Sequence, residues 1–181
     1  MKTLIIYTSQ TGFTKKYAQW LAEKTNGEVL ELKEAKKKDE AFFDEYQAIA
    51  YGGWAVAEKV AQVDWFLGKV SGWKEKRLAI FVVGANVSDS PMTQKMLDGV
   101  LTAEQKSYVK IFYCQGGLCY EKLNLPNRLA MKAFASMLKK KKDATEELKQ
   151  MGELISNSFD ASDEKYVEPI AEWLQGAQGW F

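Results

Sequence analysis

The stretch that decides the fold of this chain is Leu4-Ile5-Ile6-Tyr7-Thr8-Ser9-Gln10-Thr11-Gly12-Phe13-Thr14. It begins as a short apolar run and ends in a cluster of hydroxyl side chains around one glycine. An amphipathic stretch over 15–24 follows at once, which predicts the order strand, tight loop and helix. A helix N-terminus carries unpaired N–H groups and the positive end of the helix dipole. Because the hydroxyls of Ser9, Thr11 and Thr14 add further donors, the loop is suited to bind a phosphate.

This loop lacks the residues that mark other phosphate sites. It has no lysine between Thr8 and Thr14, so it is not the triphosphate loop G-x-x-x-x-G-K-[ST]. It also lacks G-x-G-x-x-G, which excludes the usual dinucleotide fingerprint. Neutral donors and a helix dipole suit a monophosphate held as a resident group better than a triphosphate with its metal. The alternative is a plain helix cap, since Ser and Thr commonly cap helices.

Length and composition bound the class of protein. The chain has 181 residues with 46% hydrophobic content, which predicts a single domain over 1–181. It has no apolar stretch long enough to cross a membrane, and Met1-Lys2-Thr3 enters a strand without the features of a signal peptide. With only Cys114 and Cys119 there is no disulfide framework, so we expect a cytoplasmic protein. The net charge of +1 predicts no nucleic-acid partner.

The chain contains 0 histidines, and this absence restricts its chemistry. Ser-His-Asp and Cys-His catalysis are excluded, as is any zinc site that uses histidine. Two cysteines cannot supply four thiolates, so we expect no metal site. Demanding chemistry must come from other side chains or from a cofactor, and a bound flavin needs no protein acid–base pair.

Strands and helical stretches alternate along the chain. We expect strands over 4–7, 28–32, 48–51, 77–84 and 109–114, and helices over 15–24, 41–46, 60–70, 92–100 and 125–138. The charge run 33–40 reads as a solvated loop, and the last helix should kink at Pro169 or begin near Glu168. Alternation of this kind predicts an α/β fold of three layers, with a five-stranded parallel sheet of order 2-1-3-4-5 and an inserted helix after the fifth strand.

Two later strand ends should lie beside the first loop, because ligands bind beyond the carboxyl ends of parallel strands. Gly52, Gly53, Trp54 and Ala55 end the third strand. The glycines would let the backbone approach a ligand closely, or they form only a turn; Trp54 would stack on a ligand ring or pack against a helix. The fourth strand ends in the stretch 84–88, which would form a second wall or a turn that caps the helix starting at Ser90-Pro91.

Two other features each leave two interpretations open, and the tail has one. Cys114 and Cys119 would form a redox pair, although their spacing is not C-x-x-C and buried cysteines are common. The basic amphipathic stretch 125–142 would lie on a membrane surface, or would pack on the sheet with its lysines at the helix C-terminus; we favour packing. The tail would dock through Trp180 and Phe181.

Two motifs resemble one known family. Ser9-Gln10-Thr11-Gly12-Phe13-Thr14 resembles the FMN phosphate loop of flavodoxins. The stretch 112–123, followed by Asn127-Arg128-Leu129-Ala130-Met131-Lys132, resembles a branch that includes the flavodoxin-type, quinone-linked protoporphyrinogen oxidases. The resemblance implies a flavodoxin-like fold and bound FMN. It also implies roles for a set of residues, in which the phosphate would be held by Ser9, Gln10, Thr11, Gly12, Phe13 and Thr14, and the ring would be flanked by Gly53, Trp54 and Ala55 on one side and Ala85, Asn86 and Val87 on the other.

Two departures from the family pattern limit what the resemblance implies. After Leu118 the chain reads Cys-Tyr-Glu-Lys-Leu-Asn, without the repeated arginine and aromatic residues of the porphyrinogen-oxidising members. Its charge balance is also not strongly acidic, unlike that of electron-shuttle flavodoxins. We therefore expect an FMN-binding carrier that exchanges electrons with partner oxidoreductases. The alternative is an FMN-dependent oxidoreductase that acts on a small molecule or quinone, with Arg128 and the basic helix near the substrate or membrane.

Overall fold

The computed structural model describes residues 1–56, 58–141 and 145–176, so Trp180, Phe181 and Lys142 lie outside the described residues. The strands are β1 (Thr3–Tyr7), β2 (Glu28–Glu31), β3 (Ala48–Val56), β4 (Lys59–Val60), β5 (Arg77–Gly84), β6 (Val109–Gln115), β7 (Gly117–Leu118) and β8 (Phe159–Asp160). The helices are α1 (Phe13–Thr25), α2 (Leu32–Ala35), α3 (Glu40–Asp44), α4 (Val63–Leu67), α5 (Pro91–Val100), α6 (Leu125–Lys140), α7 (Glu146–Leu154) and α8 (Glu168–Gln175). Short 3-10 helices are η1 (Val70–Trp73), η2 (Gln105–Ser107), η3 (Tyr120–Lys122) and η4 (Glu164–Val167).

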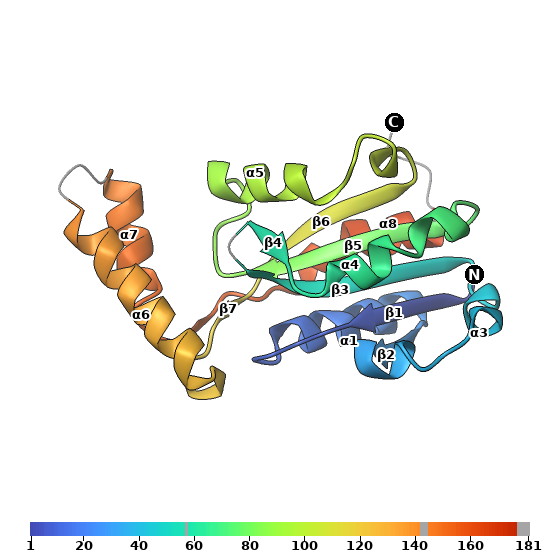
Figure 1. Ribbon diagram of the computed structural model, residues 1–181, viewed down its shortest axis with the longest axis horizontal. Coiled ribbons are helices and arrows are strands. Elements are labelled where there is room, and N and C mark those ends of the chain that lie inside the picture. The colour runs from blue at the N-terminus through green and yellow to red at the C-terminus, as the bar shows by residue number, and fades with distance from the viewer. Residues whose placement is uncertain (57, 142–144, 177–181) are drawn as a thin grey trace.

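The central sheet has the strand order β2-β1-β3-β5-β6, and these five strands are parallel (Figure 1). Leu4 pairs with Ile49, Ile49 with Leu78 and Leu78 with Val109, so four apolar runs stand in one register. This confirms the predicted order 2-1-3-4-5. The strands predicted from continuous apolar runs are the ones that are buried, as is typical of a parallel sheet covered on both faces.

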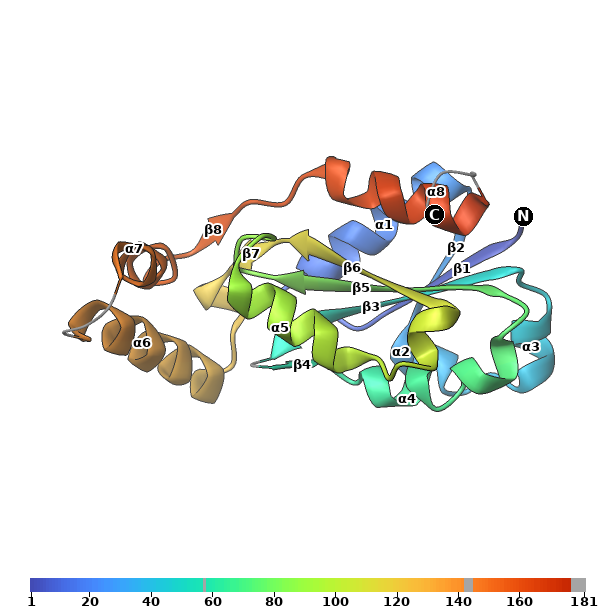
Figure 2. The same cartoon turned by 90° about the horizontal axis from the view of Figure 1, so that it is seen from above.

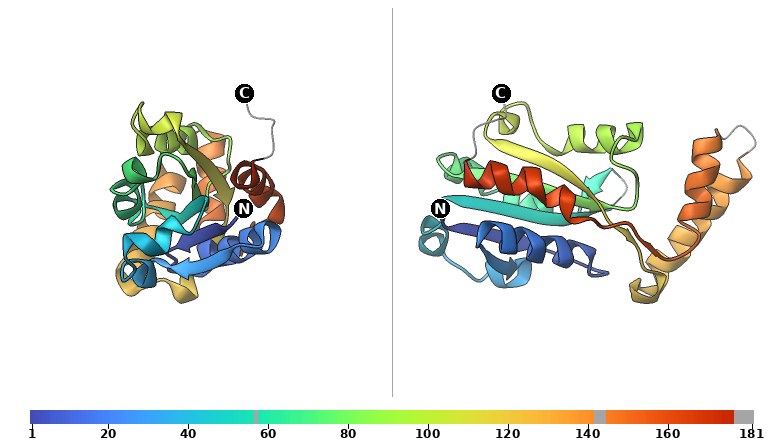
Figure 3. Two further views of the ribbon diagram at one scale, coloured as in Figure 1. Left: turned by 90° about the vertical axis from the view of Figure 1, so that its right-hand side faces the viewer. Right: turned by 180° about the vertical axis from the view of Figure 1, so that it is seen from behind.

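Helices cover both faces of the sheet (Figure 2). Side chains alternate between faces along each strand, so Leu4 and Ile6 join one core cluster while Ile5 and Tyr7 join the other. The first cluster is covered by the helices α2 to α5. The second is covered by α1 and α8, which lie side by side when the molecule is seen from behind (Figure 3). The helix α8 starts at Glu168 with Pro169 in its first turn, as predicted.

The strand β3 continues past its predicted end. We expected the Gly52-Gly53 pair to close the strand, whereas β3 runs on to Val56 and turns back to pair with β4. A Cβ on Gly52 would lie 2.1 Å from Cζ of Phe81, so the glycine makes room for a buried aromatic ring. The interpretation of these glycines as a turn is therefore wrong, because core packing requires them within the strand.

Two predicted segments differ from the structure between β2 and β5. The helix expected over 60–70 is confined to α4, since Val60 belongs to β4 and Val70 opens the 3-10 helix η1. The run 33–40, expected as a loop, is partly helical because α2 turns Leu32 and Ala35 into the core. These elements are short, so each has too few apolar residues for the sequence to distinguish the spacing of a helix from that of a strand.

The insertion after β6 is larger than the predicted single helix. It contains β7, α6, α7 and β8, with β7 and β8 paired antiparallel, and we call residues 117–160 the arm. The helices α6 and α7 pack against each other beyond the carboxyl ends of the strands (Figure 1). The prediction that α6 packs on the sheet is therefore wrong. Its partner is α7, and three of its apolar side chains remain exposed: Leu125, Leu129 and Met137.

Candidate functional site

The loop between β1 and α1 has the geometry of an anion-binding turn. Gly12 is the N-cap of α1 and has φ +101°, a conformation that glycine adopts readily. Its N–H donates to Oγ of Ser9 at 3.1 Å, which leaves the Ser9 hydroxyl hydrogen for another acceptor. Among the described residues, no hydroxyl of the loop accepts from an N–H group in the first turn of α1, so the plain-cap interpretation of these residues is wrong.

The first turn of α1 presents free backbone donors at this loop. The first bond within the helix runs from the N–H of Lys16 to the carbonyl of Gly12 at 3.0 Å. The N–H groups of Phe13, Thr14 and Lys15 precede this bond and have no partner within the helix. The dipole of α1 adds positive potential at the same point.

A cavity of about 430 Å³ opens where the strands end, and we call it the strand-end cavity. Its lining comes from all three predicted strand ends and from the arm, and comprises Gln10, Thr11, Phe13, Thr14, Trp54, Ala55, Val56, Val83, Gly84, Ala85, Gly117, Leu118, Leu123, Asn127, Ala130 and Met131. Trp54 is half-buried and lines this cavity from the end of β3, and its contact with a ligand ring stays a prediction. The helix α6 closes the cavity through Asn127, whose amide donates to Oε1 of Gln10 at 3.4 Å.

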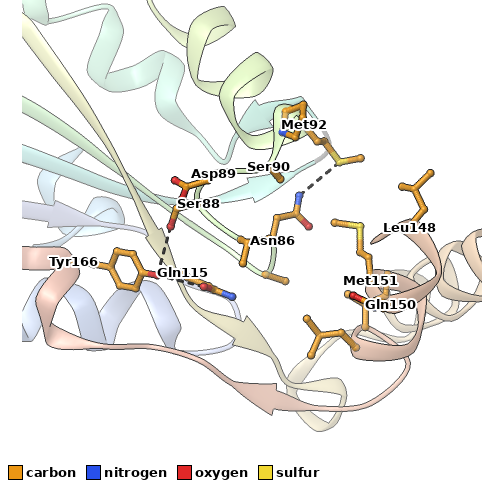
Figure 4. Close-up of a pocket in the computed structure, with 15 residues that line it drawn as sticks. Asn86, Ser88, Asp89, Ser90, Met92, Gln115, Leu148, Gln150, Met151 and Tyr166 are labelled. Carbon is orange, nitrogen blue, oxygen red and sulfur yellow. Dashed lines mark hydrogen bonds between the residues drawn. The ribbon is translucent and has the colours of Figure 1, made fainter. Parts of the chain in front are cut away.

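A second cavity of about 950 Å³ lies between the body of the fold and α7, and we call it the arm cavity (Figure 4). Apolar side chains of Met92, Leu148 and Met151 face it, and Tyr166 donates to Oε1 of Gln115 at 3.2 Å along its polar side (Figure 4). Ala85 lines both cavities, so both extend to the residue that follows β5.

The predicted site residues divide between these places. Ala85 lies in both cavities, whereas Asn86 and Val87 line only the arm cavity. The Asn86 side-chain amide donates to Sδ of Met92 at 3.6 Å (Figure 4). The backbone carbonyl of Asn86 accepts from the Tyr113 hydroxyl at 2.8 Å. Gly53 lines neither cavity, because it is buried within β3 with Val60 packed against it. Of the predicted site residues, the strand-end cavity therefore brings together Gln10, Thr11, Phe13, Thr14, Trp54, Ala55 and Ala85. Ser9 and Gly12 belong to the same loop but line a smaller neighbouring cavity, while Gly53, Asn86 and Val87 lie elsewhere.

Comparison with known families decides the identity of this fold. The model of the family described as Flavodoxin domain matches residues 4–145. The chain belongs to the flavodoxin domain family. No curated protein matches the chain.

Solved structures similar to this flavodoxin domain share little sequence with it. An archaeal flavodoxin is 14% identical, with 97% of this chain and 99% of that chain covered and a TM-score of 0.43. The two-electron reduced flavodoxin of Megasphaera elsdenii is 16% identical, with 85% of this chain and 98% of that chain covered and a TM-score of 0.44. The family assignment rests on the match over 4–145.

The residues of this flavodoxin domain fit a flavin mononucleotide. The loop offers hydroxyls and unpaired N–H groups around a glycine without a side chain, which is the donor set a phosphate needs. The strand-end cavity has the size and the largely apolar lining of a cofactor site, and the aromatic residues Phe13 and Trp54 are part of that lining. In the described part of the chain, no group of three or more metal-ligating side chains is found. No described helix is long and apolar enough to span a membrane.

Several site residues of this flavodoxin domain could not be found from the sequence. Leu123, Ala130 and Met131 line the strand-end cavity from the arm. Lys122 lies beside Gly12, where an added Cβ would stand 3.7 Å from its Nζ. The sequence motif around 112–132 marked the arm, but no local pattern tells which arm residues fold back onto a loop about a hundred positions earlier.

Two buried ionisable groups of this flavodoxin domain, Tyr113 and Cys114, are kept protonated by their surroundings. Burial raises the pKa of the Tyr113 phenol, so it stays a neutral donor to Asn86. Burial also raises the pKa of the Cys114 thiol, which keeps it protonated and unreactive. Both Cys114 and Cys119 are free, so no disulfide joins them, and the interpretation of Cys114 as a buried core residue is confirmed.

Proposed function

We propose that this flavodoxin domain binds FMN and transfers electrons to or from partner oxidoreductases. One observation carries this proposal: a loop with free donors for an anion and a cavity lined by Trp54 meet at the carboxyl ends of β1, β3 and β5. A bound FMN supplies one- and two-electron transfer, chemistry that the side chains of this chain do not provide.

The proposed roles follow from position. Ser9 and Thr11, together with the N–H groups at the start of α1, would hold the phosphate. Trp54 and Ala85 would flank the ring from the ends of β3 and β5. Met131 and its neighbours on α6 would exclude water from one side, which strengthens every electrostatic contact to the ring. Gly53 would not touch the ring. Its role would be to leave room for Val60, so that β4 can turn back and pair with β3 next to Trp54.

The experiment that tests this proposal is flavin binding by purified protein and by two threonine variants. We expect a yellow protein that quenches FMN fluorescence on titration. Thr11→Val and Thr14→Val should each weaken FMN binding by roughly 1.5–3 kcal/mol, the effect of losing a hydrogen bond to a charged group. Thr25→Val is the control, because its hydroxyl binds the carbonyl of Leu21 at the far end of the same helix. A colourless protein that binds no added FMN would disprove the proposal.

A second candidate function is an FMN-dependent oxidoreductase of the protoporphyrinogen oxidase (quinone) type. The arm cavity favours it, because a space of about 950 Å³ with apolar walls adjoins the proposed ring position at Ala85. Such a cavity would suit an apolar substrate with a few polar groups facing Gln115 and Tyr166. An electron carrier that docks proteins needs no cavity of this kind.

Turnover separates the two candidates. Protoporphyrinogen and a menaquinone analogue are supplied to the FMN-loaded protein, in parallel with partner reductases. Met151→Glu places a charge in the arm cavity and should abolish small-molecule turnover while FMN affinity stays constant. Met137→Glu, on the exposed side of α6, is the matched control. Electron transfer to proteins only, unaffected by Met151→Glu, would support the carrier.

A further inference from the structure

The ammonium group of Lys122 lies at the phosphate loop although it belongs to the arm. Its Nζ stands 3.7 Å from the place of a Cβ on Gly12, the N-cap of α1. Lys122 lines two small cavities, of about 280 and 410 Å³, and both also contain Thr11 and Gly12. The smaller one includes Ser9, whose hydroxyl turns back to the N–H of Gly12.

The backbone that carries Lys122 is firmly held. Tyr120 in the same 3-10 helix is buried, and its hydroxyl donates to the carbonyl of Ile155 at 2.6 Å. The N–H of Tyr120 donates to Oγ of Ser158 at 3.0 Å. These contacts fix the backbone position of Lys122, while its side chain is exposed to solvent.

The acidic groups around this lysine are engaged elsewhere. Asp160 pairs with Lys16 at 3.0 Å, and Glu31 pairs with Lys33 at 3.0 Å. Glu121 accepts hydrogen bonds from Ser158 at 2.8 Å and from Cys119 at 3.3 Å. Among the side chains that the structure describes, those of 1–56, 58–141, 145, 146 and 148–176, no carboxylate forms an ion pair with Lys122. The Lys122 ammonium group therefore has no counter-charge among these side chains, and the N–H groups at the start of α1 beside it can donate to an anion.

We infer that Lys122 binds the phosphate of FMN, so that the arm supplies the cation that the loop sequence lacks. This inference rests on the proposed function, because it concerns the phosphate of the same cofactor. A phosphate dianion between the α1 N-terminus and an ammonium group gains a charge-assisted hydrogen bond in addition to the neutral donors. The lysine thereby makes the site specific for the phosphorylated flavin over riboflavin.

Flavin titrations of Lys122→Gln test the inference. Dissociation constants for FMN and for riboflavin are measured by fluorescence quenching, at low and at high salt. We expect the FMN constant to rise about tenfold or more, as for a lost hydrogen bond between charged groups, with the riboflavin constant unchanged. The salt dependence of FMN binding should also weaken, and Lys122→Arg should restore part of the affinity.

Lys106→Gln is the matched control, because it removes the same charge from the exposed 3-10 helix η2 before β6. Circular dichroism establishes that each variant is folded. FMN affinity that survives Lys122→Gln, or an equal loss for FMN and riboflavin, overturns the inference while leaving the proposed function intact. Wild-type protein that binds neither flavin overturns the proposed function and the inference together.

Discussion

At the scale of single residues, Gly52 shows how closely the site depends on the core beneath it. The residue pairs with Tyr7 on one side and Phe81 on the other, directly below the strand ends that line the cavity. The Phe81 ring fills the space that a side chain on Gly52 would need. The position of Trp54, two residues further along β3, therefore depends on this contact.

Gly52→Ala should lower the free energy of unfolding by roughly 1–3 kcal/mol, because the added methyl group overpacks the core against Phe81. Urea denaturation measures the change. Combining it with Phe81→Leu should cost less than the sum of the two single changes. Gly99→Ala is the control, since nothing lies within 4 Å of its Cβ position, and it should be neutral or stabilising. Additive costs of Gly52→Ala and Phe81→Leu would contradict the packing account.

Local chemistry predicted the loop itself, and Ser9, Thr11 and Gly12 lie together between β1 and α1 as expected. Their binding of a phosphate stays a prediction. Lys122 was not predictable, since its place beside Gly12 depends on how the arm folds back. Asn86 was predicted for the ring site, yet its side chain faces Met92 because the backbone turns between Ala85 and the helix cap at Ser90.

At the scale of elements, the bounds of a strand or helix were predicted correctly where a long apolar pattern is uninterrupted. The strand β5 has the predicted bounds because its apolar run is continuous and fully covered. The helix α7 was missed, since only part of one face meets α6 and most of its residues are polar. Short elements such as β4 and α2 are stabilised by the neighbours on which they pack, so their own sequence indicates them weakly.

The ion pair between α1 and β8 should make the arm contact sensitive to acid. Partial burial works to raise the pKa of Asp160, but hydrogen bonds from Ser162 and the Lys16 ammonium hold it below the usual 3.8. A lowered pKa stabilises the folded state above about pH 5, and this contribution is lost as the pH falls through the folded-state value. Asp160→Asn should therefore lower stability at pH 7 and flatten the decline between pH 5 and pH 3.

Urea denaturation across this pH range checks the prediction for Asp160. Asp98→Asn is the control, because Asp98 is 81% exposed and its contact with Lys106 is long, at 3.8 Å. Such an exposed pair contributes little to stability. An acid decline that is equally steep in wild type and Asp160→Asn would show that the contact between α1 and β8 does not stabilise the fold.

At the scale of the whole molecule, the arm is the part with the smallest core of its own. Its buried cluster is Leu118, Tyr120, Ala135, Leu138 and Ile155, whereas each face of the sheet buries a much larger set. Contacts to the body through Gln10, Gly12 and Lys16 lie around the loop between β1 and α1. A segment with few buried contacts opens at low free energy cost, so the arm should be the first region to open.

Binding of FMN should therefore protect the arm as well as the loop. The cofactor would fill the space between Thr11 and Met131, so that opening the arm would expose it. At about 100 times its dissociation constant, FMN should raise the free energy of unfolding by about 2.7 kcal/mol.

Hydrogen exchange measured by mass spectrometry should slow in 9–14 and in 118–131, and remain unchanged in α3 at the amino ends of the strands. Riboflavin should protect the arm less, because it lacks the group that Lys122 would bind. Slower exchange confined to 9–14 would show that the arm does not close over the cofactor.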